Sequence, residues 1–110
     1  MEELIARVTN RTGLDAATAV VALSHDAKLD DAALIAALRS EAFYVGALGS
    51  RKTHAGRVER LTHAGIAAAD IARIHAPIGL DIGAQGAAEI ALSIIAEVIA
   101  VARGKGGARP

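Results

Sequence analysis

The residues most capable of chemistry lie in one stretch, residues 43–54, which reads FYVGALGSRKTH. Its apolar first half has the length and residue types of a strand, its glycines let a ligand approach the backbone, and Ser50 can cap a following helix. Because backbone N–H groups at a helix start attract phosphate or carboxylate, the stretch predicts an anion site at a strand end. The residues of this site would be Gly46, Gly49, Ser50, Arg51 and Lys52. The alternative is a tight turn before a solvated basic helix start.

A second group of polar side chains follows a continuous apolar run directly. Ser24, His25 and Asp26 stand where α/β sheets bind ligands, and His25 can donate to an oxygen or carry a proton near neutral pH. The alternative is a turn in which Asp26 caps Lys28 or Leu29. A Ser-His-Asp hydrolase is disfavoured, because adjacent residues in a strand alternate faces and cannot form a proton relay.

The third candidate segment, residues 75–83, combines a histidine, an aspartate and permissive glycines in the kind of irregular stretch that often carries function. Its candidate binding residues are His75, Gly79 and Asp81. The alternative is a turn shaped by the proline and glycines, with Asp81 satisfying nearby amides. We expect no metal site, because no pair of histidines has the i, i+4 spacing of helical zinc ligands.

The hydrophobic pattern predicts the elements that must position these segments. Residues 4–8 have helical spacing and predict a short first helix. Two apolar runs predict strands, and the residues between them a helix capped by Asp30 or Asp31, which together make a βαβ unit. The predicted strands are Thr18–Leu23 and Phe43–Ala47.

The second half of the chain is predicted to be mainly helical. A helix after Gly49 presents Val58 and Leu61 on one face and Arg57 with other charged residues on the opposite one, and it ends near Gly65. One or two helical turns, a loop or edge strand and a long final helix follow. The final helix, residues 89–102, has apolar residues around much of its circumference, which predicts burial on more than one side.

Composition limits the class of protein. The chain has 110 residues, is 53% apolar with two aromatic residues, and carries no formal net charge, which predicts one small domain and removes the electrostatic case for nucleic-acid binding. It has no cysteine, which excludes disulfides, thiolate metal ligands and a cysteine nucleophile. The acidic start lacks the positive residues of a signal peptide, so we expect a cytoplasmic protein without a membrane span.

Two strands are too few for a free-standing sheet, so we expect completion by a second copy or by a partner. No G-x-G-x-x-G turn follows the first strand and no acidic residue is placed to bind a ribose, so NAD(P) binding is not expected. The predicted fold class is therefore α/β, with a partial Rossmann-like parallel sheet flanked by helices. We assign residues 1–104 to this single domain and residues 105–110 to a disordered tail.

Three separated motifs of the chain resemble the C-terminal domain of the XdhC/CoxI accessory proteins. They are SHDAKLDD at 24–31, YVGALGSRKTH at 44–54 and IHAPIGLDIGA at 74–84, followed by EIA at 89–91. The resemblance covers roughly residues 18–104. It implies a Rossmann-like domain of a factor that matures xanthine dehydrogenase and related molybdenum hydroxylases by binding the molybdenum cofactor, protecting it and delivering it to the apo-enzyme.

The chain departs from the family pattern at two places. It starts where a full-length member would be midway through its Rossmann domain, so we expect the first βαβ half, with its glycine-rich turn, to be missing. Gln85-Gly86-Ala87-Ala88 replaces the usual polar, proline-containing entry to the last helix, which weakens its cap.

The resulting hypothesis is a non-enzymatic accessory protein with one crevice for the molybdenum cofactor, as molybdopterin or its dinucleotide form. Its partners would be a molybdenum hydroxylase apo-enzyme and either a second copy or a protein that supplies the missing half. Two alternatives stay open: a homodimeric scaffold with a vestigial crevice, and a nucleotide-dependent oxidoreductase or sulfur-transfer enzyme.

Overall fold

The computed structural model describes residues 4–7, 18–23 and 26–104. Four strands and four helices lie in these ranges. The strands are β1 (Leu4–Arg7), β2 (Thr18–Ala22), β3 (Tyr44–Ala47) and β4 (Ile74–His75). The helices are α1 (Ala27–Leu38), α2 (Arg51–His63), α3 (Ala68–Ile71) and α4 (Gly86–Ala102).

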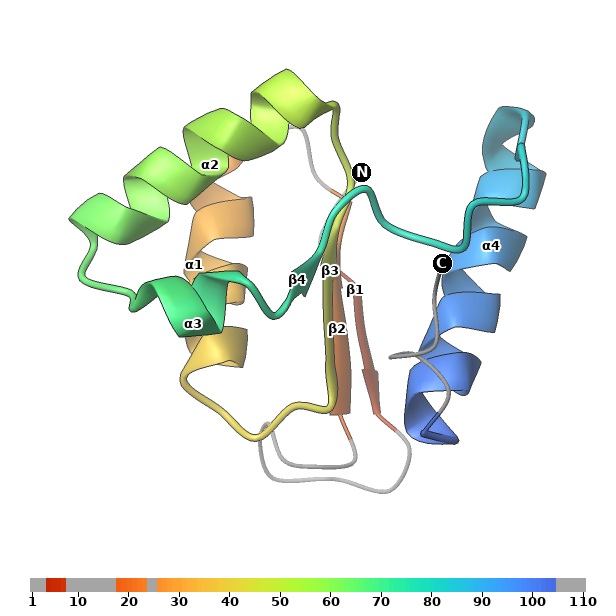
Figure 1. Ribbon diagram of the computed structural model, residues 1–110, viewed down its shortest axis with the longest axis horizontal. Coiled ribbons are helices and arrows are strands. Elements are labelled where there is room, and N and C mark those ends of the chain that lie inside the picture. Colours follow the sequence, from red (N-terminus) through yellow and green to blue (C-terminus); the bar gives the residue numbers. More distant parts are fainter. Residues whose placement is uncertain (1–3, 8–17, 24–25, 105–110) are drawn as a thin grey trace.

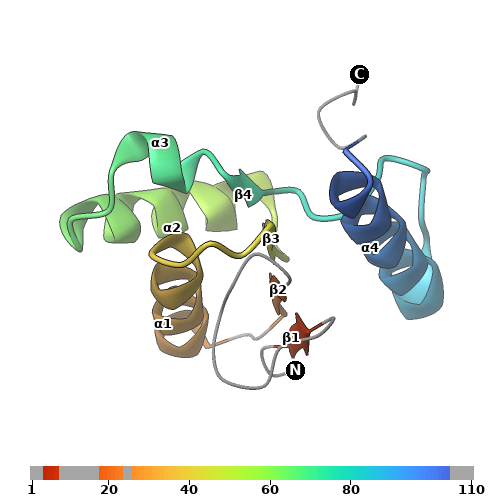
Figure 2. The same cartoon turned by 90° about the horizontal axis from the view of Figure 1, so that it is seen from below.

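One sheet with the order β1-β2-β3-β4 forms the middle layer. β2, β3 and β4 run parallel, and β1 pairs antiparallel with β2. Figures 1 and 2 show α1, α2 and α3 on one face of this sheet and α4 alone on the other. The carboxyl ends of the parallel strands therefore meet at one edge, beside the start of α2 and the loop that leads to α4.

Side-chain alternation along the strands divides the core into two clusters. Val20 and Val45 belong to the cluster that also contains Leu34 and Leu61 of the covering helices. Ala19, Val21 and Tyr44 belong to the other cluster, together with Ile94 of α4. All five residues of β2 are buried, as expected for a strand covered on both faces.

The predicted α/β class and the βαβ unit from β2 to β3 are confirmed. The predicted helix at residues 4–8 is wrong, because residues 4–7 form β1. The expectation of two strands is also wrong, since β1 and the short β4 extend the sheet on its two sides. Residues 105–110, predicted as a tail, lie outside the described residues.

The helix boundaries differ from the prediction at two starts. α1 begins at Ala27 with Asp26 as its N-cap, rather than at Asp30 or Asp31. α4 begins at Gly86, three residues before the predicted start. Its predicted burial on more than one side is wrong in this chain, because a row of its aliphatic side chains is exposed. None of the helices in the described ranges has the length and apolar character needed to cross a bilayer.

Candidate functional site

The carboxyl end of β3 leads into Leu48 and Gly49, a short segment that borders two cavities. The larger cavity, about 540 Å³, is called the crevice here. It lies between this segment, the loop after β4 and the first half of α4. Its lining residues are Leu48, Gly49, Pro77, Ile78, Gly79, Leu80, Asp81, Ile82, Gly83, Ala84, Ile90 and Ser93.

The loop that walls the crevice is fixed to α4 by backbone hydrogen bonds. The N–H of Gly79 donates to Glu97 Oε1 at 3.1 Å, and the N–H of Leu80 donates to the backbone oxygen of Ser93 at 3.1 Å. Gly79 has a φ of +92°, and a Cβ at this position would collide with the Ser93 hydroxyl. Glycine is therefore required here by both conformation and space.

Below this loop, a buried polar cluster joins the sheet to α4. The Tyr44 hydroxyl donates to Glu97 Oε1 at 2.6 Å, and both side chains are almost wholly buried. The His75 ring stacks on the Tyr44 ring with a centroid distance of 4.5 Å, and its Nδ1 lies 3.5 Å from Glu97 Oε1. Because buried polar groups must be satisfied internally, this cluster fixes the position of α4 on the sheet.

The smaller cavity, about 260 Å³, lies on the other side of the Leu48–Gly49 segment, between α1 and α2. Arg57 lines it and is only 2% exposed. Its Nη2 donates to the Leu48 oxygen at 3.0 Å and its Nη1 lies 2.9 Å from His54 Nδ1. Since arginine can only donate, His54 accepts at Nδ1 and carries its proton on Nε2. Arg57 thus supports the segment that borders both cavities.

Burial and charge shift the pKa values of this pair. Burial, with a smaller contribution from the Arg57 charge, lowers the pKa of His54 below its ordinary value of 6.5. Burial also lowers the pKa of Arg57, against the opposing effect of the Asp30 and Asp31 carboxylates. His54 is therefore held neutral to a lower pH than a free histidine.

The start of α2 combines a capped backbone with exposed cationic side chains. The Ser50 hydroxyl oxygen accepts from the N–H of Thr53 at 3.1 Å and caps the helix. Arg51 and Lys52 follow on the exposed first turn. Neither side chain lines the crevice or the smaller cavity, and both follow closely after Gly49, which lines the two cavities.

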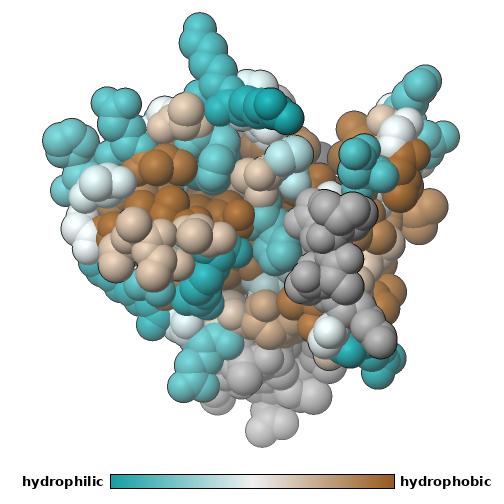
Figure 3. Space-filling model, in the orientation of Figure 1, coloured by the Kyte–Doolittle hydropathy of each residue, from teal (hydrophilic) through white to brown (hydrophobic). Residues whose placement is uncertain are grey.

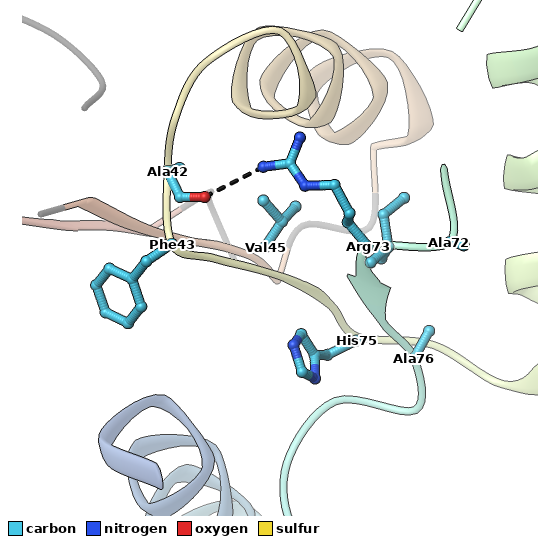
Figure 4. Close-up of a pocket in the computed structure, with 8 residues that line it drawn as sticks. Ala42, Phe43, Val45, Ala72, Arg73, His75 and Ala76 are labelled. Atoms are coloured by element: carbon cyan, nitrogen blue, oxygen red, sulfur yellow. Dashed lines mark hydrogen bonds between the residues drawn. The ribbon is translucent and has the colours of Figure 1, made fainter. Parts of the chain in front are cut away.

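A third cavity, about 410 Å³, lies at the amino end of β3 and includes His75 among its lining residues. Figure 4 shows Arg73 reaching toward Ala42, while the His75 ring lies on the side of the strand that faces α4. Arg73 donates to the backbone oxygens of Leu38 and Ala42 at 3.0 and 3.2 Å. These bonds tie the segment after α3 to the end of α1. The charged residue of this cavity therefore has a structural role.

Comparison with known proteins assigns the fold to a family. Residues 2–98 match the family described as the XdhC Rossmann domain. The chain belongs to this family. The match confirms the resemblance found in the three sequence motifs.

Two curated relatives and one solved structure are similar to this XdhC Rossmann domain. It is 40% identical over 88 residues to the molybdenum cofactor insertion chaperone PaoD of Escherichia coli K12, covering 80% of this chain and 28% of PaoD. It is 41% identical over 58 residues to the uncharacterized protein YqeB of the same organism, covering 53% of this chain and 11% of YqeB. A crystal structure described as a xanthine dehydrogenase from Bacillus halodurans superposes with a TM-score of 0.66 at 30% identity, covering 86% of this chain and 26% of that one. The chain thus spans less than a third of each of these proteins.

Within the XdhC Rossmann domain, the predicted site residues separate into groups. Gly49, Gly79 and Asp81 line the crevice together. Ser50, with Arg51 and Lys52 after it, adjoins the crevice at the start of α2. Asp26 caps α1 by accepting from the N–H of Lys28 at 2.9 Å, as the alternative interpretation of this segment had it. Ser24 and His25 lie outside the described residues.

The contacts of Gly46 and His75 are with other parts of the fold, and neither residue lines the crevice. A Cβ on Gly46 would approach Ile78 Cδ1 to 2.6 Å and the Tyr44 hydroxyl to 2.8 Å, so glycine at 46 makes room for the loop after β4. His75 is a member of the buried polar cluster and does not line the crevice. Among the described residues, no group of three histidine, aspartate or glutamate side chains is arranged to hold a metal ion.

Three side chains that shape the site were not predicted from the sequence. Arg57 was placed on the solvated face of its helix, which is wrong, although it stands one turn before the buried Leu61 and so shares its face. Ser93 and Glu97 interrupt the apolar run of α4 at i, i+4 and are both buried. Two polar residues on one face of an otherwise apolar helix could have indicated buried polar contacts on that face.

Proposed function

We propose that the chain is the cofactor-recognition part of a molybdenum cofactor insertion chaperone that serves molybdenum hydroxylases. The observation that carries this proposal is the crevice at the carboxyl end of the parallel strands, bordered by Gly49 and by the loop of Gly79 and Asp81. This is where open α/β sheets bind ligands, and the volume is in the usual range for a small-molecule site. The ligand class is that of the similar protein PaoD, which is named as a molybdenum cofactor insertion chaperone.

The lining suits an uncharged heterocycle with a charged tail. Most lining side chains are apolar or glycine, and Asp81 is the one charged residue among them in the described part of the chain. We propose that Asp81 accepts from the N–H groups of a pterin and that Arg51 and Lys52 meet its phosphate at the edge of the site. The cofactor is cargo, and when bound it supplies the dithiolene that holds molybdenum for the client enzyme.

The proposed roles of this domain are therefore recognition and shielding. The loop that covers the crevice is held by Glu97 and Ser93, so it offers a preformed wall rather than a surface that must order on binding. We infer that the partner is a molybdenum hydroxylase apo-enzyme, since PaoD is named as a molybdenum cofactor insertion chaperone and the similar solved structure is described as a xanthine dehydrogenase.

Thermal unfolding with added molybdopterin, released from a molybdenum enzyme, tests this function. The unfolding midpoint of the 110-residue chain should rise with cofactor concentration and then saturate. Asp81→Ala should weaken binding about 10- to 100-fold, and Arg51→Ala about tenfold, as expected for lost hydrogen bonds to charged groups. Glu41→Ala and Arg39→Ala, which remove exposed charges far from the crevice, should leave binding unchanged.

Either of two results would contradict the proposal. One is the absence of a saturable shift with the wild-type chain. The other is a shift that the Asp81 and Arg51 variants reproduce in full, because the ligand would then bind elsewhere.

A further inference from the structure

The outer surface of α4 carries a row of exposed apolar residues with regular spacing. Leu92, Ile95 and Ile99 are 61%, 56% and 53% exposed. With the exposed alanines at either end they recur at alternating steps of four and three residues, the spacing of a coiled-coil seam. We call this row the α4 seam: Ala88, Leu92, Ile95, Ile99 and Ala102. In Figure 3 hydrophobic surface extends along the side of the molecule formed by α4.

The seam is not needed to hold α4 on its own domain. The opposite side of the helix is the buried one, where Ile94 packs against the sheet and Glu97 enters the polar cluster. Three large aliphatic side chains in a straight row are therefore left uncovered by the described residues. A row of this kind on a helix is typical of an interaction surface.

The ends of the helix indicate which partner fits. Glu89 and Arg103 are exposed, and each directly follows a seam alanine, so both occupy the same flanking position one turn beyond the aliphatic row. In an antiparallel pair of identical helices, equivalent flanking positions face each other. Glu89 of one copy then comes alongside Arg103 of the other, twice by symmetry.

We propose that two copies of the chain associate through antiparallel pairing of their α4 seams. Ile95 then lies opposite Ile99 of the second copy, and Leu92 lies opposite its Ala102. The interface is isologous, so one surface covers itself and leaves no edge for further growth. A parallel pair is disfavoured, because it would bring Glu89 against Glu89, Arg103 against Arg103 and the helix dipoles into the same direction.

This arrangement also affects the crevice. Ile90, in the first half of α4, belongs to its lining. Antiparallel pairing brings Arg103 of the second copy to that end of the helix. Each crevice thereby gains a nearby cation from the second copy. Within one copy, Arg103 lies at the opposite end of α4 from the crevice.

The helix is 17 residues long, or about 25 Å, so the interface is small and its dissociation constant should be micromolar. Sedimentation velocity from about 1 to about 200 µM should show a reversible monomer–dimer equilibrium. Ile95→Glu should weaken it at least about tenfold, because it buries two carboxylates beside the symmetry axis. Leu29→Glu is the matched control: it alters an aliphatic residue on α1 that is 46% exposed, and it should leave the equilibrium unchanged.

Cysteine cross-linking tests the direction, since the chain has no cysteine of its own. The double variant Leu92→Cys with Ala102→Cys should form covalent dimers under mild oxidation, and Leu92→Cys alone should not. Cross-linking by the single variant would overturn the antiparallel arrangement. A monomer at every concentration, or a dimer that Ile95→Glu leaves intact, would overturn the interface itself. Neither result bears on cofactor binding, which the thermal shift measures separately.

Discussion

Replacing Tyr44 by phenylalanine should destabilise the domain by about 1.5–3 kcal/mol. The substitution removes only a hydroxyl that donates to Glu97 Oε1 at 2.6 Å in a fully buried site. A hydrogen bond to a carboxylate contributes about 1.5–3 kcal/mol, and its loss leaves Glu97 with less compensation for burial. The ring, its stacking on His75 and its packing volume are all retained, so the loss reports on the hydrogen bond alone.

Urea unfolding followed by circular dichroism measures this change. With a slope of about 1–3 kcal/mol per molar urea, the midpoint should fall by roughly 1 M. Thr62→Val is the control, because it removes the hydroxyl that donates to the Val58 oxygen at an exposed site, and it should cost less than about 0.5 kcal/mol. A Tyr44→Phe variant as stable as the wild type would refute our account of how α4 is attached to the sheet.

Three further predictions concern single residues. Burial and the Arg57 charge depress the pKa of His54 in the folded state, so near this pKa the folded state binds fewer protons than the unfolded one. The contribution of His54 to the free energy of unfolding is therefore fully present above pH 6.5 and is lost as the pH falls through the folded-state pKa. His54→Gln should reduce this loss of stability between pH 8 and pH 5.5, measured by urea unfolding at both pH values. Gly46→Ala should cost about 1–3 kcal/mol by thermal unfolding, and Ile78→Val should recover part of it by freeing the space that the new Cβ needs. Asp26→Ala should cost about 1 kcal/mol, seen as a lower urea midpoint, because it removes the cap of α1, and a stability unchanged by this substitution would contradict the capping role.

Local pattern predicted the elements whose signals lie within a few residues of each other. The buried run at 18–23 and the strand before Gly49 were found because continuous aliphatic residues of strand length have few alternatives. The cap at Ser50 and the helix end at Gly65 follow from side-chain and backbone chemistry at single positions. Two of the three strands that form the parallel sheet were therefore predictable. For the segment that contains β4, the sequence predicted either a loop or an edge strand.

Long-range contacts decided the rest. Four residues at 4–7 are too few to separate a helical from an extended pattern, and their antiparallel register with β2 settles the choice. Tyr44 and Glu97 are 53 positions apart in sequence, so no local rule joins them. The crevice itself depends on such contacts, because its two walls come from the end of β3 and from the loop before α4.

The orientation of α4 links the crevice to the seam. Hydrophobicity alone gives this helix no unique orientation, because its aliphatic residues surround it, so the polar contacts must decide which side faces the sheet. Glu97 accepts from the Gly79 N–H and the Ser93 oxygen accepts from the Leu80 N–H, which places this side of α4 against the loop. The same two bonds turn Leu92, Ile95 and Ile99 to the outside. A substitution that frees α4 from this orientation should therefore disturb the crevice wall and the dimer surface together, whereas Ile95→Glu should disturb only the second.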